Sequence, residues 1–308
     1  MENKKHLFLI NPNTSRNRIK QQKAEEIKEV CDQDGLDYEI YWAQSPEEAA
    51  SFVLRKSKEY EELRVYICGG DGTVNNILNA AYQCKNIEFG VIPLGSGNDF
   101  VRTFGEHSDY LDIRKMLYGT SMPVDLIRAN DRICVNMLNI GFDEKVVSFV
   151  QKRRDYRIMR SAFAYTISAL VQLAGMPMEH AKVTFDDGTV VDKKFLLCAI
   201  ANGSYCGGGY YAASNAEPDD GLIDVLLINP IHRTTFLKIL GRYKSGTILN
   251  TPIGKKMIIQ KKCRTLIMEK DTEFEVCNDG DIYQTKRLEC EILPGKVRLI
   301  TPVKGSIL

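Results

Sequence analysis

The chain has 308 residues, of which 44% are apolar and 26% are charged, a composition typical of a globular protein. This length is enough for two domains, at roughly 100 to 200 residues per domain. Lysine plus arginine (41) nearly balances aspartate plus glutamate (40), so no large overall field draws the molecule to nucleic acid or to an acidic membrane. Any such attraction must be local, and we expect no nucleic-acid partner.

The cysteines and the apolar segments indicate a cytoplasmic protein. Nine cysteines are scattered without a CxxC pair, which fits reduced and buried thiols. The apolar run around residues 7–10 is too short for a secretory signal. Residues 161–178 carry no charge and are about as long as a membrane span. Their polar residues, glycine and proline favour a packed or interfacial helix over a spanning one.

Over residues 1–100, apolar strand-like runs alternate with helical patterns, as in the βαβ units of a mostly parallel sheet. One helix is expected from about Arg18 to Gly35, and another opens at Ser45-Pro46 with a capping box and a proline in its first turn. The expected strands are 6–10, 38–42, 65–68 and 88–92.

Beyond Pro123 the sequence changes to short alternating runs separated by hairpin turns. The expected turns are Asn130-Asp131 and Asp187-Gly188, and residues 195–228 and 257–291 are strand-rich. Helical patterns interrupt this region near 143–175 and 232–245. We therefore expect a second, mainly antiparallel domain.

The third expected strand runs into the turn Gly69-Gly70-Asp71-Gly72-Thr73, which a helical pattern follows. Glycines let the backbone approach phosphate oxygens closely, and the free amides at a helix start donate hydrogen bonds to them. Because a bare carboxylate repels phosphate, Asp71 is better suited to organise a metal ion or a water molecule. The simpler alternative is a tight strand-to-helix turn in which Asp71 is a cap.

The second turn, residues 93–100, repeats this pattern after the next strand. In open α/β sheets, ligands bind at the carboxyl ends of the strands, so two amide-rich turns there could clamp one polyphosphate. Asn11, Arg16 and Lys20 could add phosphate contacts. Taken alone, Arg16 and Lys20 would be solvated surface charges.

Five elements together resemble, in order and spacing, the bacterial diacylglycerol kinase-like lipid kinases, to which sphingosine and ceramide kinases are more distantly related. They are Asn11-Pro12, GGDGT at 69–73, PLGSGND at 93–99, the glycine run 207–209 leading to Asp219-Asp220-Gly221, and Asp279-Gly280-Asp281. The resemblance covers nearly the whole chain, whereas GGDGT alone also occurs in NAD kinases and phosphofructokinases. It implies an α/β fold, with a three-layer nucleotide-binding domain around a mostly parallel sheet plus a second β-sandwich domain, and a nucleotide between them.

The resemblance also implies which residues bind ATP. Phosphates lie against the GGDGT turn in that family. The implied set is Asn11, Gly69, Gly70, Asp71, Gly72, Thr73, Val74, Asn75 and Ser96. To this set we add Arg16, on the basis of its charge beside the first turn and not of the resemblance.

For the metal, the resemblance implies a structural Mg²⁺ bound by Asp220 and by the backbone carbonyls of Glu217 and Leu222. Asp219 would connect through water to Asp71, which makes Asp71 an expected catalytic residue.

The family's general base is the acid of a DGE element, which corresponds here to Asp281. The assignment is chemically reasonable because phosphoryl transfer needs a carboxylate that orients and deprotonates the acceptor alcohol. Without the resemblance, residues 278–281 would be interpreted as a hairpin turn, in which Asp-Gly is a favoured dipeptide.

Two positions depart from the family pattern. The expected base is an aspartate, shorter by one methylene group than the usual glutamate, and Asn76 replaces the glutamate that commonly follows GGDGT-x-N. These departures keep open a noncatalytic nucleotide-binding regulator. A soluble-substrate kinase of the NAD kinase type is disfavoured because residues 93–100 and the DDG and DGD elements match the lipid branch.

Phosphorylation of a lipid also requires access to a membrane. A basic cluster can hold a protein on anionic lipids at about 1 kcal/mol per basic residue, although a solvated helix face is an equal alternative. The cluster, which precedes an apolar helical pattern at 158–173, is Lys152, Arg153, Arg154, Arg157 and Arg160.

We therefore predict a kinase that uses ATP and Mg²⁺ to phosphorylate a lipid hydroxyl group, with diacylglycerol as the leading substrate on the resemblance alone. An ATP-binding domain would span residues 1–124 and be completed by 293–308, and residues 125–292 would form a lipid-substrate domain. The protein would be cytoplasmic and peripherally associated with a membrane, and a homodimer is left open.

Overall fold

The computed structural model describes residues 4–11, 17–152, 168, 171, 175–176 and 178–305. The chain divides into unit 1, which is Met1–Asp125 with Pro294–Leu308, and unit 2, which is Leu126–Leu293. Strands β5 (Thr120–Ala129) and β14 (Asp281–Thr301) each continue from one unit into the other. Arg16, most of the apolar segment 161–178, and Arg153, Arg154, Arg157 and Arg160 lie outside the described residues.

Unit 1 is built on a sheet in which every neighbouring pair from β14 to β2 is parallel. Strands β1 and β3 are buried along nearly their whole length, because a parallel sheet is covered on both faces. The strand order is β14, β4 (Ile87–Pro93), β3 (Leu63–Gly69), β1 (Lys5–Ile10) and β2 (Tyr38–Trp42). The expected mostly parallel sheet is confirmed.

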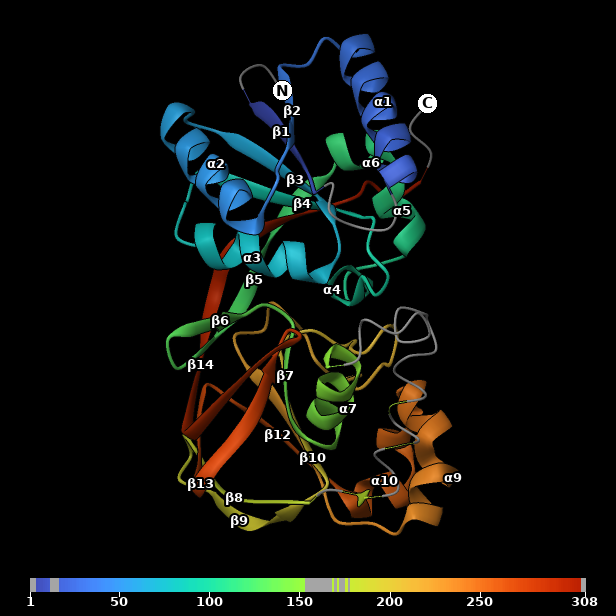
Figure 1. Cartoon of the computed structure of the whole chain (residues 1–308), viewed down its shortest axis with the longest axis vertical. Helices are drawn as coiled ribbons and strands as arrows, with labels where there is room; N and C mark the ends of the chain where they lie inside the picture. The colour runs from blue at the N-terminus through green and yellow to red at the C-terminus, as the bar shows by residue number, and fades with distance from the viewer. Residues whose placement is uncertain are drawn as a thin grey trace. The chain divides into compact units, whose positions relative to one another are not determined.

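Helices cover both faces of this sheet, which gives the three layers that were expected (Figure 1). Two helices pack together on one face, α2 (Pro46–Glu59) and α3 (Asp71–Ala81), and α1 (Asn17–Gln33) packs against α6 (Ile113–Leu117) on the other. The predicted start of α2 is confirmed, since the Glu48 N–H donates to the Ser45 hydroxyl at 3.2 Å and Pro46 is the first helical residue. The short helices α4 (Asp99–Arg102) and α5 (His107–Leu111) follow β4.

Unit 2 is built from antiparallel strands, as the sequence predicts. The strand order is β12 (Ile258–Cys263), β11 (Ile223–Ile228), β10 (Leu197–Ala201), β7 (Met137–Gly141), β13 (Thr265–Asn278) and β14. The hairpin of β8 (Glu179–Phe185) and β9 (Val190–Phe195) pairs with β13, and β6 (Arg132–Cys134) pairs with β5. Both predicted hairpin turns are confirmed, and Asn130 and Gly188 take φ values of 55° and 80°.

The central strands of unit 2 are buried on both faces. In β10, Cys198 and Ile200 join one apolar cluster, whereas Leu197 and Ala199 join another, because successive side chains of a strand point to opposite faces. The second cluster also includes side chains from four helical elements. These are α7 (Phe142–Gln151), α9 (Arg233–Lys244), the 3-10 helix η2 (Thr247–Asn250) and α10 (Pro252–Met257).

No two of the nine cysteines are joined by a disulfide and seven of them are buried, as predicted. Among the described residues, no helix has the length and apolar character needed to cross a membrane.

Candidate active site

The two glycine-rich turns of unit 1 touch each other. Strands β3 and β4 pair in parallel up to Gly69 and Pro93, so both turns begin at the same edge of the sheet. The Leu94 N–H donates to the Gly69 carbonyl at 3.0 Å. A β-carbon added to Gly95 would lie 2.4 Å from the α-carbon of Gly70. Only glycine fits at this contact, so the two turns form one continuous backbone surface.

Helix α3 begins at this surface with open backbone donors. Gly70 is its N-cap, and no side chain caps the first turn. The amides of Asp71 and Gly72 make no hydrogen bond within the described part of the chain. Amides that are free at a helix N-terminus, where the helix dipole is positive, bind phosphate groups.

The carboxylate of Asp71 connects the two turns. Its Oδ1 accepts a hydrogen bond from the Phe100 N–H at 3.2 Å, in the first turn of α4. The simpler interpretation of the sequence made Asp71 a cap within its own strand-to-helix turn. In the structure its carboxylate instead accepts from the first turn of α4, the helix that follows the second turn.

Asn98 shapes the second turn, a role that the sequence analysis missed. Its backbone is left-handed, with φ of 55°, and its Oδ1 accepts from the Gly95 N–H at 3.0 Å. Its Nδ2 donates to the carbonyls of Gly95 and Pro93 at 3.0 and 3.3 Å. The signal in the sequence was the asparagine that follows Gly95-Ser96-Gly97, because asparagine adopts the left-handed conformation more readily than other residues except glycine.

The other predicted ATP residues of unit 1 differ in their exposure. Ser96 is exposed on the second turn. Val74 and Asn75 are only 2% and 8% exposed, so they lie behind the GGDGT surface. The Asn75 side-chain oxygen accepts from Asn79 Nδ2 at 2.6 Å. Gly70, Gly72 and Thr73, rather than these two side chains, present the surface to a ligand, and Gly69 is buried at the end of β3.

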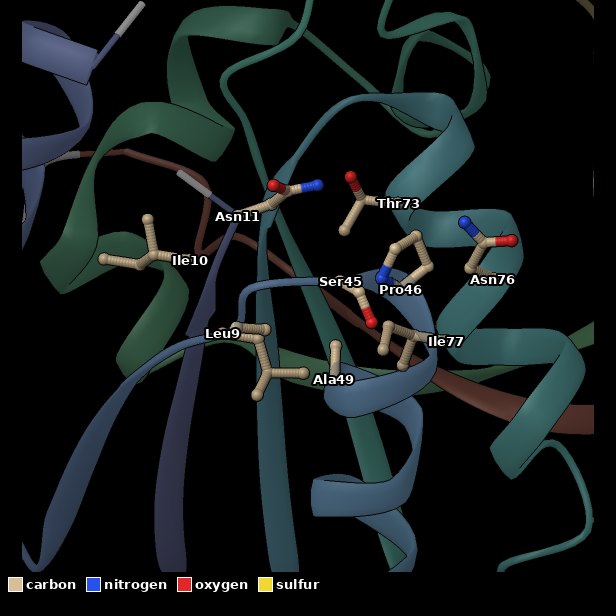
Figure 2. Close-up of a pocket in the computed structure, with 10 residues that line it drawn as sticks. Leu9, Ile10, Asn11, Ser45, Pro46, Ala49, Thr73, Asn76 and Ile77 are labelled. Carbon is tan, nitrogen blue, oxygen red and sulfur yellow. The ribbon is translucent and has the colours of Figure 1, made fainter. Parts of the chain in front are cut away.

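Asn11 lies at the end of β1, beside a shallow pocket that adjoins the GGDGT turn (Figure 2). In this view Asn11 and Thr73 approach the same end of the pocket, and Asn76 projects from α3 near Pro46. The lining residues are Leu9, Ile10, Asn11, Ala43, Ser45, Pro46, Ala49, Thr73, Asn76 and Ile77. Asn76, one of the two departures from the family pattern, is thus part of the pocket wall.

Lys20 does not have either of the roles considered for it. Its side chain is buried, with the residue only 1% exposed, and the ammonium group donates to the Asn11 carbonyl. Burial lowers the pKa of Lys20. It is neither a solvated surface charge nor free to contact phosphate, because it lies on the inner face of α1 and holds the end of β1. The predicted contact from Arg16 stays a prediction.

In unit 2, residues 278–281 form the hairpin turn that the sequence alone indicated. Asn278 pairs with Asp281, and the two residues between them, Asp279 and Gly280, have φ values of 48° and 98°. Asp281 is exposed at the start of β14. This position leaves its carboxylate open to a ligand, and its role as a base stays a prediction.

Asp279 has a structural role that the sequence analysis did not identify. Its carboxylate accepts hydrogen bonds from the backbone N–H groups of Val135, Asn136 and Met137 at 2.6, 3.0 and 2.9 Å. Burial raises the pKa of Asp279 to about 6, although these donors act in the opposite direction. The first aspartate of the DGD element therefore fixes the loop before β7, and the second is exposed.

The predicted metal element is also part of an ion-pair network. Asp220 Oδ1 accepts from the Leu222 N–H at 2.9 Å, and its Oδ2 lies 2.6 Å from the Lys262 ammonium. Lys262 is also 3.3 Å from Asp224, and burial raises the pKa of Asp224 to about 6.

The residues at Asp220 fit Mg²⁺ in their chemistry, because a carboxylate and backbone carbonyls are the oxygen ligands that this ion prefers. Among the described residues, no three histidine, cysteine or acidic side chains converge on one point, so such a site would depend on the carbonyls of Glu217 and Leu222. A cation there would compete with Lys262 for Asp220. Asp219 is exposed, and its connection to Asp71 stays a prediction.

Comparison with known proteins identifies the family. Residues 5–129 match the diacylglycerol kinase catalytic domain, and residues 136–301 match the YegS C-terminal NAD kinase beta sandwich-like domain. The chain therefore belongs to the diacylglycerol kinase-like lipid kinases, and the expected α/β domain with a second β-sandwich domain is confirmed.

The chain is similar to curated relatives over most of its length. It is 28% identical to a probable lipid kinase YegS-like protein of Shewanella frigidimarina, over 78% of this chain and 76% of the relative. It is 26% identical to a protein of the same description from Pseudomonas aeruginosa, over 78% and 77%. The crystal structure of a diacylglycerol kinase from Bacillus anthracis has the same fold, with a TM-score of 0.74 and 21% identity over 97% of both chains.

The contact between the turns predicts a specific effect of Gly95→Ala. The new β-carbon would meet both Gly70 and the Asn98 side chain, at 2.4 and 2.7 Å. We expect a loss of roughly 1–3 kcal/mol in the free energy of unfolding, measured by urea denaturation. Gly72→Ala is the control, because its β-carbon would meet nothing within 4 Å. Equal stability of the two variants would contradict the tight contact.

The ion pair at Asp220 predicts that Lys262→Met increases the affinity of the chain for Mg²⁺. Removal of the partly exposed ammonium group frees the Asp220 carboxylate from an ion pair that contributes about 1 kcal/mol. This energy corresponds to roughly a fivefold gain in the affinity for Mg²⁺, which isothermal titration calorimetry measures. Lys261→Met is the matched control, because Lys261 lies on the same strand but pairs with Asp187 at 2.6 Å. If neither the wild type nor Lys262→Met binds Mg²⁺, Asp220 is not a cation site.

The two aspartates of the DGD element are expected to respond differently to substitution. Asp279→Asn loses acceptors for buried amides and should lower the free energy of unfolding by roughly 1–3 kcal/mol. Asp281→Asn changes an exposed side chain and should stay within about 0.5 kcal/mol of wild type. Calorimetric unfolding of both variants tests this difference, and a stable Asp279→Asn variant would contradict the anchoring role.

Proposed function

We propose that this kinase transfers the γ-phosphoryl group of ATP to the hydroxyl group of a lipid, and that the lipid is diacylglycerol, which becomes phosphatidic acid. The observation that carries the proposal is the joined backbone surface at Gly70 and Gly95, with the uncapped start of α3 beside it. This surface suits a polyphosphate, and the family membership supports a lipid as the acceptor.

In this proposal the phosphates of ATP lie against Gly69, Gly70, Gly72 and the amide of Asp71. Thr73, Asn11 and exposed Ser96 border the nucleotide, while buried Val74 and Asn75 support the turn from behind. Because Asp71 is held by the Phe100 amide, its carboxylate is directed at the second turn and does not need to reorganise when the nucleotide binds.

Asp281 would act as the general base. Its carboxylate accepts the proton of the lipid hydroxyl group as the hydroxyl oxygen attacks the γ-phosphorus, and the bond to the β-phosphate oxygen breaks to release ADP. When bound, Mg²⁺ supplies positive charge, and in unit 2 Asp220 with the carbonyls of Glu217 and Leu222 would hold it. The product would serve the synthesis of phospholipids.

The test is transfer of radiolabelled γ-phosphate from ATP to a panel of detergent-dispersed lipids, with NAD as an additional acceptor. We expect diacylglycerol to be labelled. Asp281→Asn should lower kcat by about 100-fold or more and leave ATP affinity unchanged, because a general base acts only in the chemical step. Asp71→Ala should lower both kcat and the affinity for ATP. The control is Asp271→Asn, which changes an exposed acid of β13.

Each other outcome identifies a different function. Labelling of NAD alone would indicate a soluble-substrate kinase. ATP binding without labelling of any acceptor would support a noncatalytic regulator, and the assignment of Asp281 as base would then be withdrawn.

A further inference from the structure

One long segment of unit 2 has charges of only one sign. Residues 225–268 contain nine lysine and arginine residues and no aspartate or glutamate, in a chain whose net charge is +1. The segment runs from β11 through α9, η2, α10 and β12 to the start of β13. The overall balance of charge therefore conceals a strongly basic region.

The helices of this segment present a cationic face. Their inner side chains, such as Phe236, Ile239 and Met257, belong to the apolar cluster, and both α9 and α10 pack on η2. The cationic face consists of the exposed side chains Lys238, Arg242, Lys255 and Lys256. Within the described residues none of these four forms an ion pair, whereas Lys261 and Lys262 on β12 are paired with aspartates.

The same two helices expose aliphatic side chains. Leu237 on α9 is 50% exposed and Ile253 on α10 is 36% exposed, and they are two of six large hydrophobic residues that are exposed among the described residues. Leu237 directly precedes Lys238 in α9, and Ile253 lies three residues before Lys256 in α10, a spacing that makes two residues neighbours on a helix surface. Lys238 and Arg242 are also four residues apart on one helix, a like-charge pair that destabilises a helix in water. Folding alone gives no reason for this arrangement.

We propose that the cationic face of α9 and α10, with Leu237 and Ile253, docks on an anionic lipid surface. Lysine and arginine attract acidic headgroups, and exposed aliphatic side chains insert at the boundary with the acyl chains. A single exposed leucine is normal on a protein surface, but here two lie among unpaired cations in a segment without acids. The proposal rests on the proposed function only in explaining how a lipid kinase reaches its substrate, because vesicle binding needs no catalysis.

The test is sedimentation of the full chain with vesicles of phosphatidylcholine, with and without phosphatidylglycerol. Each basic residue near the surface contributes about 1 kcal/mol, which corresponds to roughly a fivefold change in the partition coefficient. A double variant that removes two of them should therefore lower the partition coefficient by roughly 25-fold. The two double variants are Lys255→Gln/Lys256→Gln and Lys238→Gln/Arg242→Gln. High salt should abolish binding, because screening shortens the range of the attraction. The matched control is Lys28→Gln/Lys58→Gln, which removes two exposed cations from unit 1.

Several results would overturn the proposal. The proposal is wrong if both double variants bind vesicles as the wild type does, or if the control variant loses as much binding as they do. It is also wrong if the wild type binds equally well to vesicles without phosphatidylglycerol. Binding of a single-stranded RNA probe without vesicle binding would assign the face to nucleic acid. Kinase activity on detergent-dispersed diacylglycerol is measured in parallel, so vesicle binding without any kinase activity would refute the proposed function and leave the docking surface intact.

Discussion

The close contact between Gly70 and Gly95 is the constraint on which the nucleotide surface depends. Parallel pairing of β3 and β4 brings two chain reversals to the same place, and a side chain on either residue would separate them. Asp71 and Asn98 both act on this contact, the first by accepting from the Phe100 amide and the second by hydrogen bonding to Gly95. Backbone donors held in this way are preorganised, so phosphate binding would cost little rearrangement.

Polar residues of the family motifs divide between two kinds of task. In the DGD element, Asp279 accepts hydrogen bonds from three backbone amides, while Asp281 remains exposed. In the DDG element, Asp220 bonds to the Leu222 amide and to Lys262, while Asp219 remains exposed. In the DGD element one carboxylate holds the backbone and its neighbour is exposed, whereas in the DDG element Asp220, which also bonds to the backbone, is itself the residue proposed to bind Mg²⁺. Substitution of Asp279 would therefore report on folding, whereas substitution of Asp281 would report on the proposed chemistry.

The sequence predicted most of the fold because the relevant signals are local. Apolar runs and turn residues located β2 over its full length, the start of α2 and the hairpins at Asn130 and Asp187. The role of Asp279 was missed because it depends on contacts distant in sequence, to residues more than 140 positions away. Lys20 and Asn98 bond instead to residues close in sequence, Asn11 and Gly95, but only the folded chain shows that Lys20 is buried and that the Asn98 side chain turns back on its own loop. No local pattern distinguishes Asp279 and Lys20 from solvated charges.

A lipid kinase must attract two anionic partners, and the two proposals give this chain a different means for each. Within the described residues, the nucleotide surface relies on backbone amides, since Lys20 is buried and bonded to the Asn11 carbonyl. The cations proposed to meet the lipid surface, Lys238, Arg242, Lys255 and Lys256, lie instead on α9 and α10. Amide donors at a helix start act over a short range and require a shaped ligand, whereas clustered ammonium and guanidinium groups attract any acidic surface within about a Debye length, roughly 8–10 Å in physiological salt. Placing the specific interaction on amides and the unspecific one on cations lets nucleotide recognition stay selective while attraction to the lipid surface responds to its charge.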